Sequence, residues 1–163
     1  MIITIDPSGT NITACFLFEN WTKWEFINIE DKNWLNQVKK LESLLKNKKP
    51  QLVAYETSSY LKKSYMNKHF IHLLKVVAGL EIILDREQIE NKSIDNKLVA
   101  NLEDLARSGK IKGLIYQKEQ GLIGRPKSMW YFKEKLLNEH EKDALLVFYF
   151  LWVKNSQREW PWS

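Results

Sequence analysis

A chain of 163 residues with 44% hydrophobic and 28% charged residues has the composition of a folded globular domain, which argues against a disordered or fibrous protein. Its net charge of +5 favours polyanionic partners such as nucleic acid without requiring them. The longest apolar run, 144–153, is too short to span a bilayer and no leader-like segment precedes the first strand, so we expect a cytoplasmic protein.

The domain organisation follows from the absence of a linker rich in proline, glycine and serine. We predict one domain over 1–155, followed by an aromatic tail, 156–163, that contains Trp160 and Trp162. The single cysteine, Cys15, lies in an apolar run and excludes an internal disulfide, so we expect a small buried side chain there.

The first strands form the start of the predicted sheet. A β-branched run at 2–5 ends at Asp6 and is followed by Pro-Ser-Gly turn chemistry, which predicts a buried central strand. The runs 12–18 and 23–29 predict two further strands, joined by a short polar turn. These three strands form an antiparallel meander.

A helix and a second acid-terminated strand come next. A helix begins after a cap at Asp31 or Asn33 and continues to about residue 47, with an apolar stripe along one side. The run 51–56 then reads as a buried strand that ends at Glu56. Because a helix connects the two strands, we expect this strand to lie parallel to the first in the same sheet.

The segment from residue 67 to 97 is harder to interpret. A helix from about residue 67 is apolar on nearly every side, which indicates that more than one partner buries it. Residues 80–84 read as its last turns or as a short strand. Residues 85–97 are polar and carry no usable pattern.

The last third contains two helices and one more strand. We predict a helix over 96–107, a fifth strand of the sheet over 111–116, and a basic loop over 121–127. The final helix runs over 138–154. The predicted fold class is therefore α/β, with a mixed five-stranded sheet flanked by helices.

Acidic side chains gather at one place in this scheme. Asp6 and Glu56 end two core strands, while His140 and Asp143 stand three residues apart on one face of the final helix, where it begins to be buried. Taken alone, each acid is more often a capping residue than a ligand, and a single histidine is more often a cap or a surface residue. Together they form an oxygen-rich site suited to Mg²⁺ or Mn²⁺. We expect Glu139, Glu141 and Lys142 to form a solvated first turn.

In this order and type of motif the chain resembles the ribonuclease H-like superfamily, and within it the RuvC-like Holliday junction resolvases. The matching motifs are Ile-Thr-Ile-Asp-Pro-Ser-Gly at 3–9, Ala-Tyr-Glu at 54–56 and His-Glu-Lys-Asp-Ala at 140–144. The chain departs from the family pattern at Ser8, which stands between the proline and the glycine, and over 85–128, which does not align clearly.

The resemblance implies metal-dependent hydrolysis of branched DNA with two Mg²⁺ ions per site, for which Mn²⁺ can substitute. Asp6 would bridge both ions, and Glu56 and Asp143 would each complete a coordination sphere. His140 would ligate a metal or orient the attacking water. The resemblance also implies a homodimer formed through the apolar helix that begins near residue 67.

Basic residues flank both acidic motifs and are candidates for contacts with the phosphate backbone. For any single lysine, a solvated surface charge is the better interpretation, whereas clusters beside two carboxylate motifs carry more weight. The candidates are Lys62, Lys63, Lys68, Arg125, Lys127, Lys133 and Lys135.

Three alternatives remain at this stage. The turn at 6–10 is also similar to the phosphate-binding turn of actin-like sugar kinases, but those enzymes need two such domains and 163 residues leave no room for a second. A non-catalytic binding module on the same fold would lack nuclease activity with Mn²⁺. Other nucleases of this fold, acting on flaps, RNA–DNA hybrids or plain duplex, cannot be separated from a junction resolvase by these residues.

Overall fold

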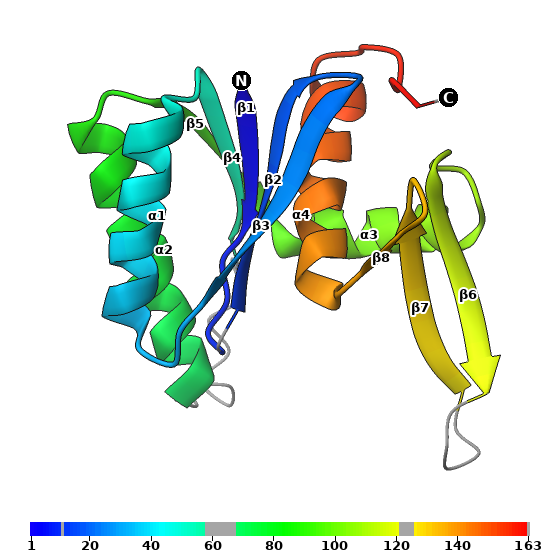
Figure 1. Cartoon of the computed structure of the whole chain (residues 1–163), viewed down its shortest axis with the longest axis horizontal. Helices are drawn as coiled ribbons and strands as arrows, with labels where there is room; N and C mark the ends of the chain where they lie inside the picture. The colour runs from blue at the N-terminus through cyan, green and yellow to red at the C-terminus, as the bar shows by residue number, and fades with distance from the viewer. Residues whose placement is uncertain (11, 58–67, 121–125, 163) are drawn as a thin grey trace.

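The computed structural model describes residues 1–10, 12–57, 68–120 and 126–162 (Figure 1). A five-stranded sheet in the order β3-β2-β1-β4-β5 forms its centre, with α1 and α2 on one face and α3 and α4 on the other. The strands of this sheet are β1 (Ile2–Asp6), β2 (Ile12–Asn20), β3 (Lys23–Glu30), β4 (Leu52–Thr57) and β5 (Glu90–Asp95). Among the described residues, no helix is long and apolar enough to cross a membrane.

The direction of each strand confirms the predicted fold class. Strand β1 pairs antiparallel with β2, and β2 with β3, so the first three strands form the expected meander. Strand β4 lies parallel to β1, as a helical crossover requires, and β5 lies parallel to β4. The carboxyl ends of β1, β4 and β5 therefore meet at one edge of the sheet.

The fifth strand was predicted at the wrong place. Strand β5 occupies part of the polar segment 85–97, whereas the predicted strand over 111–116 contributes to a second sheet. Strand β5 lies at the edge of the main sheet, where only Ile94 is deeply buried and Glu90, Asn91 and Ser93 are exposed. An edge strand with one buried side chain has no apolar run for sequence reasoning to detect.

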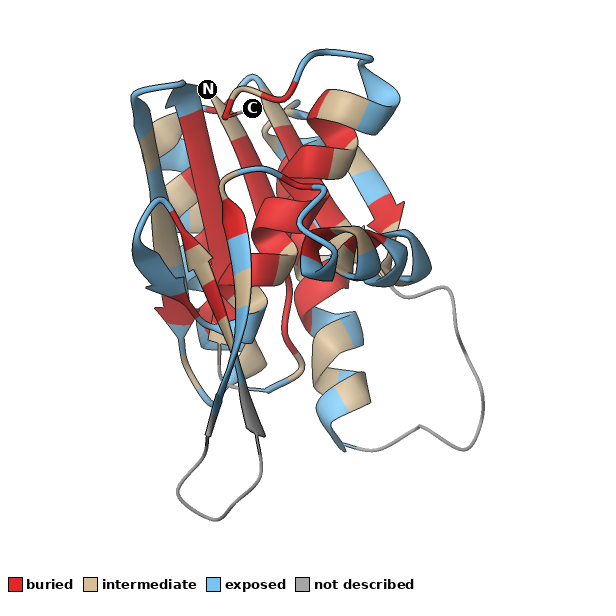
Figure 2. Cartoon of the chain, turned by 90° about the vertical axis from the view of Figure 1, so that its right-hand side faces the viewer, coloured by how far each residue is buried: buried red, intermediate tan, exposed pale blue. Residues whose placement is uncertain are grey.

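The second sheet has the order β6-β7-β8 and was not anticipated. Its strands are β6 (Leu114–Gln120), β7 (Pro126–Phe132) and β8 (Lys135–Leu137), all antiparallel. Part of the predicted basic loop, 126–127, belongs to β7, and 121–125 lies outside the described residues. Figure 2 shows the β6–β7 hairpin extending away from the buried centre of the molecule.

The helices begin and end close to their predicted limits. They are α1 (Trp34–Lys48), α2 (Lys68–Arg86), α3 (Asn96–Arg107) and α4 (Glu139–Tyr149), which continues into the π-helix η2 (Phe150–Asn155). The Asn33 side chain caps α1, which decides between the two predicted caps. Residues 80–84 are the last turns of α2 and not a strand.

Helix α4 packs directly on β1. The Thr4 hydroxyl donates a buried hydrogen bond of 2.7 Å to the Ala144 carbonyl oxygen, and both residues are fully buried. The methyl side chain of Ala144 permits this close approach of helix and strand. The contact places the first turn of α4 beside the carboxyl end of β1.

The aromatic tail contributes to the core on the α4 side of the sheet. Trp160 and Trp162 are 8% and 9% exposed, and the Trp162 ring centroid lies 4.9 Å from that of Phe132 on β7. The Trp160 indole nitrogen donates to the Lys112 carbonyl oxygen at 2.7 Å. The tail thus joins the main sheet to the second one.

We predict that Trp162→Ala lowers the free energy of unfolding by about 3–5 kcal/mol, because it removes a large buried ring and leaves a cavity between the two sheets. Urea denaturation followed by circular dichroism measures the loss. Trp21→Ala is the matched control, since Trp21 is 47% exposed and should cost much less. Equal losses for the two variants would contradict a core role for the tail.

Candidate metal site at the carboxyl ends of the central strands

Two carboxylates leave neighbouring strands at the same edge of the main sheet. In the parallel pair of β1 and β4, Ile5 lies opposite Tyr55, so Asp6 and Glu56 follow in adjacent positions. The first turn of α4 supplies His140 and Asp143 to this edge. The structure therefore brings together the elements that carry all four predicted site residues.

Asp6 and His140 are in direct contact. The Asp6 carboxylate Oδ2 lies 2.6 Å from His140 Nδ1, and the Asp6 residue is only 7% exposed. The hydrogen bond to Asp6 raises the pKa of His140, so the contact favours the imidazolium form. Burial raises the pKa of Asp6, and the hydrogen bond with His140 opposes that rise.

The other two carboxyl groups are also shifted toward their neutral forms. Burial, with the charges of Asp6 and Asp143, raises the pKa of Glu56 to about 8. Burial likewise raises the pKa of Asp143 to about 6, although the Lys142 ammonium opposes this rise. The protein therefore holds several acids where their ionised forms repel one another, and a cation would relieve that repulsion.

The donor set fits a hard divalent cation in chemical type, because it consists of three carboxylates and an imidazole. Among the described residues, however, no three histidine, cysteine, aspartate or glutamate side chains stand close enough to hold one ion. The arrangement seen here is thus not a closed coordination shell.

The first turn of α4 is less solvated than predicted. Glu141 and Lys142 are 4% and 3% exposed, and only Glu139 of the three expected surface residues is open to solvent. Glu141 completes a capping box with Asn138 and accepts a hydrogen bond from Lys135. The prediction failed because it did not include the second sheet, which lies beside this turn.

One further acid near the site was missed by sequence reasoning. Asp95 ends β5 and pairs in register with Thr57 at the end of β4. Its side chain caps α3 by accepting a hydrogen bond from the backbone N–H of Lys97. Its negative charge contributes to the raised pKa of Glu56. An acid at the end of a third parallel strand was the available signal, but β5 itself was not recognised.

The predicted phosphate contacts stay predictions. Lys62, Lys63 and Arg125 lie outside the described residues, and of Lys127 only the backbone pairing with Glu119 is described. The remaining three candidates come from separate parts of the fold: Lys68 begins α2, Lys133 lies in the β7–β8 turn with a φ of 48°, and Lys135 begins β8.

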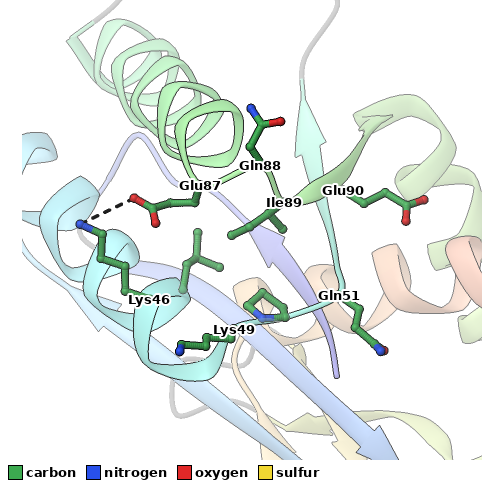
Figure 3. A pocket seen from close by; sticks show the side chains of 9 residues that line it. Lys46, Lys49, Gln51, Glu87, Gln88, Ile89 and Glu90 are labelled. Carbon is green, nitrogen blue, oxygen red and sulfur yellow. Dashed lines mark ion pairs between the residues drawn. The ribbon is translucent and has the colours of Figure 1, made fainter.

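Two cavities lie in the described part of the chain, and none of the four candidate ligands lines either of them. One of about 620 Å³ is lined by residues that include Lys46, Gln51 and Glu87 (Figure 3), and it lies at the amino end of β4, away from Glu56. Another of about 690 Å³ is lined by residues of β7, β8 and the start of α4, among them Glu139. Only the second adjoins the helix turn that carries His140.

Comparison with solved structures places this fold. The structure "T. thermophilus RuvC in complex with Holliday junction substrate" aligns with a TM-score of 0.53 over 90% of this chain and 88% of that one, at 13% identity. The chain therefore shares the fold of this RuvC structure. A second structure of Thermus thermophilus RuvC aligns with a TM-score of 0.51, also at 13% identity, over 90% of this chain and 89% of that one. No protein-family model and no curated protein sequence matches the chain.

We predict that Glu56→Gln stabilises the metal-free protein. Between about pH 4.5 and about pH 8 the Glu56 carboxyl is ionised in the unfolded chain but largely neutral in the folded one. The free energy of unfolding therefore falls as pH rises through this window. The glutamine variant avoids this loss. Its advantage should grow from near zero at about pH 4 to about 1–3 kcal/mol at about pH 8.

Urea denaturation in EDTA at several pH values measures this difference. The comparison within one pair of proteins removes the contribution of the titrating groups that do not interact with Glu56. A difference in stability that does not change with pH would contradict the assignment of a buried, repelled carboxyl at Glu56.

Proposed function

We propose that this protein is a divalent-metal-dependent endonuclease that cleaves branched DNA, with the four-way junction as its preferred substrate. The observation that carries the proposal is the convergence of Asp6, Glu56, His140 and Asp143 at one edge of a ribonuclease H-like sheet. The likeness to a RuvC structure solved with a Holliday junction supports this choice of substrate.

In the proposed reaction Asp6, Glu56 and Asp143 would hold two Mg²⁺ or Mn²⁺ ions, which would supply an activated water and stabilise the leaving oxygen. Asp6 would contribute a ligand to both ions, and Glu56 and Asp143 would contribute to one ion each. His140 keeps Asp6 oriented through Nδ1, and in the neutral imidazole its Nε2 would be the nitrogen left to bind a metal or direct the attacking water. No covalent intermediate with the protein is required.

The shape of the molecule supports binding of a bulky nucleic acid at this edge. The β6–β7 hairpin and the first turn of α2 both extend past the carboxyl ends of the central strands, and Figure 1 shows them on opposite sides of those strands. Among the proposed phosphate-binding residues, Lys68 begins α2, one of these two regions, whereas Lys133 and Lys135 belong to the β7–β8 turn and to β8 and not to the hairpin.

We predict that the wild-type protein cleaves a four-way junction in Mg²⁺ or Mn²⁺ faster than a flap, an RNA–DNA hybrid or a linear duplex. Asp6→Asn, Glu56→Gln and Asp143→Asn should each abolish cleavage while DNA binding persists, because each removes one negative charge that faces the metal without changing the side-chain shape. A gel-based cleavage panel with EDTA controls measures this.

Substitutions at His140 refine the same test. His140→Asp should retain activity with Mg²⁺, since a carboxylate can ligate the metal there, and His140→Ala should lose much of it. Cleavage of a flap, hybrid or duplex alone would assign the protein to another nuclease class of this fold. Junction binding without any cleavage would identify a non-catalytic module.

We also propose that the active form is a homodimer joined through α2. One side of this helix exposes the side chains of Ile71, Leu74 and Ile82, at 39%, 40% and 65%, with Ala78 between them. Their spacing forms a continuous apolar stripe along the helix. A second copy of the chain would cover the stripe and would present two sites to a symmetric junction.

The predicted effect of Ile82→Glu is dissociation of the dimer, because a charge would be buried in the apolar contact. Sedimentation equilibrium should give twice the chain mass of 19.4 kDa for the wild type and the single mass for the variant. Leu98→Glu, at a leucine of α3 that is 40% exposed, is the control and should remain dimeric. A monomeric wild type, with and without DNA, would disprove the dimer.

A further inference from the structure

Lys142 is a buried charge beside the candidate metal site. Its side chain is 3% exposed, and its ammonium lies 2.7 Å from Glu103, 2.8 Å from Glu139 and 3.2 Å from Asp143 Oδ1. A buried ammonium is tolerated only when negative groups compensate it. Three carboxylates therefore surround one cation at a position that carries no role in the proposed hydrolysis.

The partners of Lys142 come from two helices and constrain it from different sides. Glu139 and Asp143 belong to α4, whereas Glu103 belongs to α3 and also accepts a hydrogen bond of 3.1 Å from Arg107 Nε. The ammonium further lies 5.4 Å from the centre of the Trp130 ring on β7. These contacts hold the ammonium in place independently of Asp143.

The Lys142 ammonium also occupies a position where a divalent cation would otherwise bind. Without its ammonium, Glu103, Glu139 and Asp143 would form an acidic cluster that attracts a divalent ion on the side of Asp143 toward α3. With the ammonium present, Oδ1 of Asp143 is engaged on that side. The other oxygen, Oδ2, is then the one left for an ion shared with Asp6 and Glu56.

We propose that Lys142 is a positioning residue for the metal site: it holds Asp143 through Oδ1 and keeps metal out of the space between Asp143, Glu103 and Glu139. The catalytic consequence of this inference rests on the proposed nuclease function. The contact itself, and the exclusion of metal from the acidic cluster, can be tested without DNA.

The first test is a double-mutant cycle in EDTA with Lys142→Met and Asp143→Asn, read by urea denaturation. If the ammonium holds Asp143, the loss caused by Lys142→Met should be smaller in the Asp143→Asn background. Additive effects would overturn the proposal whether or not the protein cleaves DNA. If Lys142→Met does not fold, Lys142→Gln is used in the same cycle.

The second test is the response of thermal unfolding to Mn²⁺. The melting temperature of Lys142→Met should rise more with Mn²⁺ than that of the wild type, because an ion takes the place of the ammonium. Adding Glu103→Gln to this variant should reduce the rise, since one of the three carboxylates is lost. Equal shifts in wild type and Lys142→Met would contradict the exclusion of metal.

The third test is cleavage. Lys142→Met should slow junction cleavage by about 10- to 100-fold at saturating Mn²⁺, as changes in groups that orient metal ligands do, while Lys142→Arg retains most of the rate. A wild-type rate for Lys142→Met would overturn the positioning role. Absence of cleavage by the wild-type protein would instead refute the proposed function, and the first two tests would still decide on Lys142.

Discussion

The contact of α4 with β1 is the constraint on which the site depends. A buried hydrogen bond from Thr4 to the Ala144 carbonyl joins residues 140 positions apart, and it fixes the start of α4 at the carboxyl end of the central strand. His140 precedes Ala144 by about one helical turn, and Asp143 is the residue directly before it. A shift of the helix by one turn, about 5 Å, would separate them from Asp6 and Glu56.

The charges of the site oppose the stability of the metal-free protein. Burial and mutual repulsion raise the pKa values of Glu56 and Asp143, so the fold holds acids that would be more easily ionised in water. His140 and Lys142 provide the protein's own partial compensation. Functional sites commonly lose stability in this way, because the groups that bind a cation repel one another in its absence.

The second sheet links the periphery of the molecule to the same site. Arg107 stacks over Tyr116 on β6, with the guanidinium carbon 4.5 Å from the ring centre, and it bonds to Glu103, which in turn holds Lys142. Trp162 of the tail packs against Phe132 on β7. The hairpin is therefore anchored to the core and to the charged groups beside Asp143.

The sequence by itself determined the order of the elements around the site, because long buried strands and amphipathic helices have strong periodic patterns. It predicted Asp6 and Glu56 at the ends of two strands and His140 at the start of the final helix. Only the tertiary structure decided that Lys142 is buried, since a charged side chain is buried only when partners distant in sequence, such as Glu103, surround it. Strand β5 could not be predicted either, because an edge strand with polar side chains has no apolar pattern. It is recognised only from its pairing with β4 in the folded structure.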